Sequence, residues 1–89
     1  MAWSYDPTDL GKHLNWIRLM VGDVEATDPL ISDEEITGLL ALEQDRGAAA
    51  MKICAALAAK FAARGGKAEV EAYQLRAQEI SKYTSGGYL

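Results

Sequence analysis

Apolar residues recur every three or four positions in four stretches of the chain, which is the spacing of one face of an α-helix. In the first stretch the apolar positions are Leu10, Leu14, Ile17 and Val21. This stretch follows Asp6 and Pro7, residue types favoured at the N-cap and at the first helical position. Gly22 comes directly after it and suits the left-handed backbone that ends many helices. The pattern therefore predicts a first helix from Pro7 to about Gly22.

The segment DPLISDEEI, residues 28–36, carries the signals of a second helix start. Ser32 and Glu35 have the spacing of a capping box, in which each side chain accepts the backbone N–H of the other residue. The acidic residues that follow Ser32 stand at the positive end of the helix dipole, where negative charge is favoured. We predict a helix from Asp33 to about Glu43. Its expected buried residues are Ile36, Leu39 and Leu40.

A metal site is the alternative interpretation of the four acidic residues in this segment. A calcium-binding loop needs oxygen ligands at alternate positions, a central glycine and a final glutamate. Leu30 and Ile31 occupy positions where ligands would be needed. The helix start is therefore the preferred interpretation, and we expect no bound metal and no cofactor.

Two further helices follow in the second half of the chain. RGAAAMKICAALAAKFAAR, residues 46–64, is rich in alanine, the strongest helix former. Its apolar stripe consists of Met51, Cys54, Leu57, Ala58 and Phe61. Gly65 and Gly66 end that helix, and a last helix is predicted from Lys67 to about Tyr83, with Val70, Tyr73, Ala77 and Ile80 on one face. The expected fold is an all-α bundle of about four helices in one domain, residues 1–83, followed by a short extended tail, residues 84–89.

The net charge is −4, which argues against nucleic acid as the main partner because nucleic acid favours a basic surface. The charge is divided unevenly: residues 1–45 carry ten acidic and two basic residues, a net of −8, and residues 46–89 carry three acidic and seven basic residues, a net of +4. The two halves are either separate solvated faces or complementary surfaces of neighbouring copies. In the second case, the candidate interface residues are Glu34, Arg46, Lys60, Arg64 and Lys67.

Candidate catalytic residues are few, and we predict that the chain is not an enzyme. His13 is the only histidine and Cys54 the only cysteine, so no intramolecular disulfide is possible. Cys54 lies in the middle of an apolar stripe, where a cysteine behaves as a small buried hydrophobic residue. No apolar run approaches the roughly 20 residues of a membrane span, and the first ten residues lack the features of a signal peptide.

Aromatic residues near the two ends are candidates for contacts with a partner. Trp3 precedes the first helix and packs either on its own domain or on another molecule, since aromatic residues are enriched in interfaces. Tyr88 and Leu89 end the polar, glycine-containing tail and form a candidate docking anchor.

Residues 18–40 resemble a motif of small tailed-bacteriophage proteins that are encoded among the genes for joining head to tail. The motif runs R-L-x-(I/V)-G-D and, after a few residues, D-P-L-(L/I)-(S/T)-D-E-E-I and a leucine pair. Its most specific positions here are Gly22, Asp23, Asp28, Pro29, Ser32 and Glu35. The resemblance covers about Asp9 to Ala63. Many relatives carry a longer segment before the last helix, where this chain has only Gly65, Gly66 and Lys67.

The family resembled is that of the head–tail connector adaptors, also called head completion proteins. The resemblance implies a non-catalytic structural virion protein located at the head–tail junction and assembled in the host cytoplasm. It implies a homo-oligomeric ring, usually a dodecamer, that joins the portal protein to the stopper or tail-completion protein and through which genome DNA passes without sequence-specific recognition. It also implies that the C-terminal segment reaches toward the portal. The alternative hypothesis is a small helical regulatory or DNA-binding domain, which would require a basic recognition helix.

Overall fold

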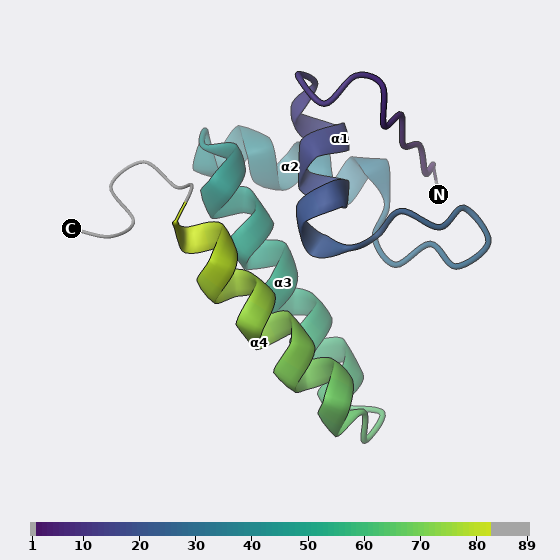
Figure 1. The fold of residues 1–89 in the computed structure, drawn as a ribbon, viewed down its shortest axis with the longest axis vertical. Coiled ribbons are helices and arrows are strands. Elements are labelled where there is room, and N and C mark those ends of the chain that lie inside the picture. Colours follow the sequence, from purple (N-terminus) through teal and green to yellow (C-terminus); the bar gives the residue numbers. More distant parts are fainter. Residues whose placement is uncertain (1, 83–89) are drawn as a thin grey trace.

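The computed structural model describes residues 2–82, which form four α-helices and no β-strand (Figure 1). The helices are α1 (His13–Val21), α2 (Asp33–Glu43), α3 (Arg46–Ala62) and α4 (Lys67–Ser81). The predicted all-α fold with four helices is therefore confirmed. The proposed tail anchor, Tyr88 and Leu89, lies outside the described residues.

The first helix begins six residues later than the sequence predicts. Residues 7–12 form turns, and α1 starts at His13, where the N-cap residue Lys12 makes no side-chain cap bond. The Asp6 side chain does accept hydrogen bonds from the Thr8 backbone and hydroxyl, at 2.9 and 2.6 Å. The expected cap is thus present, but its first turn does not continue into α1. The helix end is as expected, because Gly22 has φ of 80° and caps α1 in the left-handed conformation.

The bounds of α2 agree with the prediction, and α3 begins where expected. Both halves of the capping box are present: the Glu35 N–H donates to Ser32 Oγ at 3.1 Å, and the Ser32 N–H donates to Glu35 Oε1 at 3.2 Å. Only two residues join α2 to α3. Gln44 adopts a left-handed backbone with φ of 60°, and Asp45 caps α3 by accepting the Gly47 N–H at 3.2 Å.

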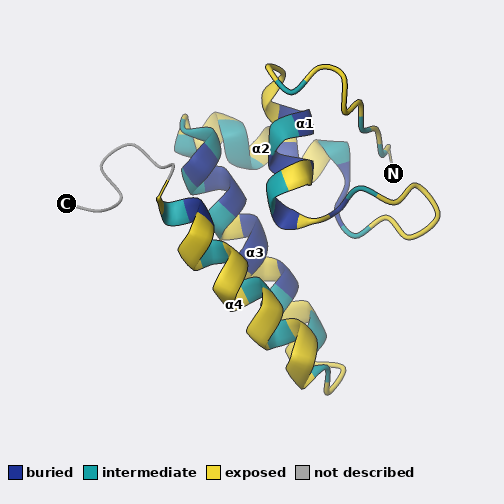
Figure 2. Ribbon diagram, in the orientation of Figure 1, coloured by how far each residue is buried: buried dark blue, intermediate teal, exposed yellow. Residues whose placement is uncertain are grey.

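Helices α3 and α4 form a long antiparallel hairpin, whose turn projects away from α1, α2 and the N-terminal segment (Figure 1). The two helices are joined by a turn at Gly65 and Gly66, and the rings of Phe61 and Tyr73 stack between them with centroids 5.7 Å apart. Only Ile80 of α4 is fully buried, so most of the outer surface of this helix faces solvent (Figure 2). The hairpin therefore offers much of its surface to solvent, especially near its turn.

The hydrophobic core lies where the part of the hairpin farther from its turn meets α1 and α2. Its buried apolar residues come from all four helices and the segment before α2: Leu14, Ile17, Val21, Ile31, Ile36, Ala49, Ala50, Ile53, Cys54, Leu57 and Ile80. Leu39 and Leu40, which were expected to be buried, are only partly buried against this core. The buried alanines of α3 occupy little volume, so neighbouring helices can approach that helix closely.

We predict that Gly22→Ala destabilises the protein more than Gly65→Ala. Both glycines have a left-handed backbone, with φ of 80° and 76°, and a non-glycine residue there costs roughly 1–2 kcal/mol. A Cβ at Gly22 would also lie 3.0 Å from Cζ of Arg76, whereas a Cβ at Gly65 meets no atom within 4 Å. Urea unfolding of both variants measures the difference. Equal losses would show that packing of Arg76 on Gly22 contributes nothing.

Candidate functional site

Arg18, on α1, is the only fully buried basic residue among residues 2–82. Its guanidinium donates to four acceptors outside α1. Nε donates to the Ser4 carbonyl at 2.6 Å and Nη2 donates to Asp33 Oδ1 at 2.6 Å. Nη1 donates to the Ile31 carbonyl at 2.8 Å and to a carboxylate oxygen of Asp23. Arg18 therefore connects α1 with the N-terminal segment, with the loop that follows α1 and with the start of α2.

Asp23, directly after the Gly22 cap, is the second buried charge of the site and is 1% exposed. Besides Arg18, its carboxylate accepts the backbone N–H groups of Leu30 and Ile31, at 3.0 and 3.1 Å. It also accepts the indole N–H of Trp3 at 3.2 Å. These bonds close the loop between Gly22 and the start of α2. Asp28 and Pro29 lie exposed in that loop.

Asp33, the first residue of α2, completes the network. Its carboxylate accepts from Arg18 and from both the N–H and the hydroxyl of Ser4, at 3.0 and 2.8 Å. Burial by itself would raise the pKa of Asp33, but the hydrogen bonds from Arg18 and Ser4 outweigh it and hold that pKa below its ordinary value. The carboxylate form is therefore the one that the folded protein stabilises.

The N-terminal arm, residues 2–4, lies across this network and covers it. The Asp33 N–H donates to the Ala2 carbonyl at 2.8 Å, and the Arg18 guanidinium lies over the Trp3 ring, with Cζ 4.7 Å from the ring centroid. Trp3 therefore packs on its own domain, which decides between the two placements that the sequence left open. We call Arg18, Asp23, Asp33 and the arm the Arg18 network.

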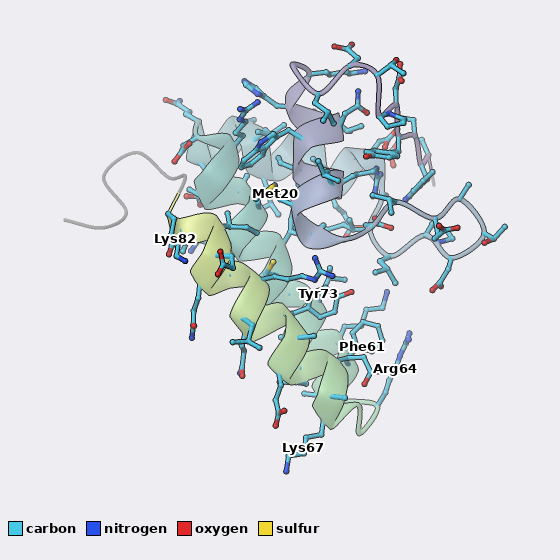
Figure 3. The ribbon with its side chains drawn as sticks, in the orientation of Figure 1. Met20, Phe61, Arg64, Lys67, Tyr73 and Lys82 are labelled. Atoms are coloured by element: carbon cyan, nitrogen blue, oxygen red, sulfur yellow. The ribbon has the colours of Figure 1, made fainter. Side chains whose placement is uncertain are left out.

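The candidate interface residues fall into separate places. The Arg46 guanidinium is used within the chain, over the ring of Trp16 at 4.3 Å. Lys60, Arg64 and Lys67 are exposed on the hairpin, and Figure 3 shows Arg64 and Lys67 at its turn. Glu34 is exposed at the start of α2 and accepts the Ala2 N–H at 3.3 Å. Three basic candidates thus gather near the hairpin turn, apart from Glu34 and Arg46.

The remaining titratable candidates do not form a reactive pair in the structure. Cys54 is buried in the core, and burial raises the pKa of its thiol to about 11, so that the thiol is protonated at neutral pH. His13 is exposed at the start of α1. Within residues 2–82, no three histidine, cysteine or acidic side chains are placed to hold a metal ion. In the same part of the chain, no helix is long and apolar enough to cross a membrane.

Comparisons with protein-family models, with curated proteins and with solved structures found no match to this chain. Every buried side-chain nitrogen and oxygen in the described part of the chain has a hydrogen-bond partner. The network is complete as it stands, which is typical of a structural role.

Sequence reasoning did not foresee that Arg18 is buried. The signal was available, since Arg18 follows Leu14 by four residues and so borders the apolar stripe of α1. Asn15 was missed as well. It is 3% exposed, and its side chain accepts the Asp6 N–H and donates to the Asp9 carbonyl, both at 2.9 Å.

We predict that Arg18→Met destabilises the protein by about 3–5 kcal/mol, because it leaves the buried carboxylate of Asp23 without its cation. Asp23→Asn in the same chain should recover part of the loss, since it removes the unpaired charge while keeping an acceptor oxygen. Chemical denaturation of the wild type, both single variants and the double variant gives the coupling. Strictly additive effects would contradict a direct interaction between the two charges.

Asp33→Asn should destabilise the protein at neutral pH by about 1–3 kcal/mol, because donors of Arg18 and Ser4 lose their charged acceptor. The folded-state pKa of Asp33 is depressed, so its contribution is present above the unfolded-state pKa and is lost as the pH falls through the folded-state value. The stability difference between wild type and variant should therefore shrink below about pH 4. Thermal unfolding across pH measures it, with the exposed Asp28→Asn as the control. A difference that stays constant with pH would contradict the prediction.

Proposed function

We propose that this chain is a non-catalytic structural protein of a phage head–tail connector, an adaptor that forms a ring between the portal and the stopper or tail. The observation that carries the proposal is the fit between the motif and the Arg18 network. The motif positions with a special role in the network or at the helix ends are Arg18, Gly22, Asp23, Ser32, Asp33 and Glu35. Because these positions, which are spread along the motif, are used in the network or at the helix ends, we interpret the motif as a signature of this fold and not as a chance similarity in composition.

The charges on the helix faces support assembly through unlike surfaces. α2 carries four acidic residues and no lysine or arginine; Glu34 and Glu35 are exposed, whereas Asp33 is engaged by Arg18 within the chain. α3 carries Arg46, Lys52 and Lys60 and no acidic residue. A contact between an acidic face of one copy and a basic face of the next is heterologous, and heterologous contacts generate a closed ring when the rotation closes.

An exposed leucine on α2 adds an apolar element to this acidic face. Leu42 is 73% exposed, and Gly38 lies one turn before it with no neighbouring atom within 4 Å of the position of a Cβ. Burial of Leu42 against the alanine-rich outer surface of α3 in the next copy would add hydrophobic area between the charged groups. Lys52 and Lys60 stand on that outer surface, near Ala55, Ala56 and Ala59, and all five residues are exposed.

Binding of DNA is the second candidate function. The exposed basic residues of α3 and the hairpin turn are the observation that favours it: Lys52, Lys60, Arg64 and Lys67. The acidic net charge of the whole chain opposes it. To distinguish the two functions, the binding of this protein to duplex DNA and to the portal protein encoded in the same genome is measured by titration. A regulator binds the duplex with a steep salt dependence, whereas an adaptor binds the portal and appears as a ring on it in electron micrographs.

We predict that Lys60→Glu with Arg64→Glu weakens self-association by at least about ten-fold at low salt, because like charges then face each other between copies. The matched control is Lys82→Glu, which reverses an exposed lysine that pairs with Glu79 at the other end of α4. Sedimentation velocity over a range of protein concentrations, alone and with portal, measures the change. Equal effects of the two charge reversals would count against the hairpin turn as a subunit contact.

A further inference from the structure

The surface beneath the N-terminal arm has the properties of a peptide-binding site. The hydrogen bonds of Ala2, Trp3 and Ser4 all join residues at least 14 positions away in sequence. They satisfy main-chain groups of an extended segment as well as the Trp3 indole and the Ser4 hydroxyl. The surface that receives them consists of Arg18, Asp23 and the start of α2, none of which belongs to the arm. It would remain complete if the arm came from another molecule.

The segment that connects the arm to α1 contains a helix start that the structure leaves unused. Asp6 already caps a first turn by accepting from Thr8, and the Asp9 N–H donates to the Asp6 carbonyl at 3.2 Å. No continuous helix forms through residues 7–12: the Lys12 N–H donates to the Asp9 carbonyl at 3.3 Å, and the Asn15 side chain bonds to that carbonyl and to the Asp6 N–H. Local sequence and tertiary contacts thus favour different conformations of residues 7–12.

We propose that the arm is exchanged between copies of this chain. In the exchanged form residues 7–12 join α1 as one continuous helix, and the arm binds the Arg18 network of a second copy. Such a helix would carry the arm outward by about 9 Å, at 1.5 Å for each of the six residues. The contacts of the arm are the same in both forms, so exchange preserves them, which is the general reason why domain swapping is a low-cost route to association.

The hydrogen-bonding groups of the site favour the arm of a second copy as its ligand. Asp23 receives an indole N–H, Arg18 stacks on the indole ring, and Asp33 receives a hydroxyl and the adjacent N–H. This donor pattern matches a Trp–Ser pair in extended conformation, and Trp3–Ser4 is the only such pair in the sequence. The inference rests on the proposed self-association into a ring and gives that ring a second, directional contact between neighbours.

Cysteine cross-linking between two full-length variants tests the exchange. In a Cys54→Ser background, one protein carries Ala2→Cys and the other carries Glu34→Cys, because the Ala2 N–H lies 3.3 Å from the Glu34 carboxylate. The two are mixed and exposed to a mild oxidant. Exchange predicts at least about ten-fold more heterodimer than a mixture of Ala2→Cys with Ala68→Cys, an exposed control position on α4, because the bound arm raises the effective concentration.

Substitutions of Gly11 test independently whether residues 7–12 can form the continuous helix of the exchanged form. Gly11 lies in residues 7–12, and a Cβ there would meet only Asp9 Oδ1, at 3.9 Å. Gly11→Ala favours the continuous helix and should raise the heterodimer yield, whereas Gly11→Pro interrupts that helix and should lower it. Sedimentation velocity on the same samples reports self-association separately. Association without excess heterodimer would overturn the exchange and leave the ring, while a monomer at every concentration would overturn both.

Discussion

A buried guanidinium must satisfy its donors without water, and the N-terminal half of this protein is arranged so that Arg18 can do so. Its acceptors come from the arm, from the loop after α1 and from the start of α2. Replacing a buried ion pair by apolar residues often leaves a protein equally stable, and in some proteins such a pair serves to specify one arrangement. Here the arrangement fixes how α1 meets α2, because displacing either helix would leave a charge unpaired.

The two ends of the molecule are held together by different kinds of contact. Near α1 the structure is determined by directional polar contacts, and α3 supplies small buried side chains to the core. Toward the hairpin turn the rings of Phe61 and Tyr73 stack on each other, and α4 buries only Ile80 completely. The end near the turn is exposed and carries charges of both signs, since Lys60, Arg64 and Lys67 lie there together with Glu69.

In the arm and the residues that follow it, local sequence preference and tertiary contacts disagree. The Arg18 network holds residues 2–4 in an extended conformation, while residues 6–9 carry the local signals of a helix. Conflicts between local preference and the global fold tend to occur where a protein has a second use for a segment. The proposed exchange of the arm would use that conflict, because the polar contacts that hold the arm within the chain would form equally between two copies.

Several features could be predicted from the sequence because their causes lie within a few residues. The capping box of Ser32 and Glu35 starts α2, and the left-handed Gly22 ends α1, through bonds between near neighbours. The alanine-rich segment forms α3 through intrinsic propensity. The motif residues were recognised as a pattern, but the pattern did not show that Arg18, Asp23 and Asp33 meet in one network.

Only the tertiary structure decided where the charged side chains and the arm lie. The first helix was predicted to begin at Pro7 and begins at His13, because Asn15 and the docked arm hold residues 7–12 in turns. The burial of Arg18 and the packing of Trp3 depend on contacts between residues up to 20 positions apart. Helix periodicity reports which face of a segment is apolar, whereas the partner that neutralises a buried charge is determined by how distant segments meet in space.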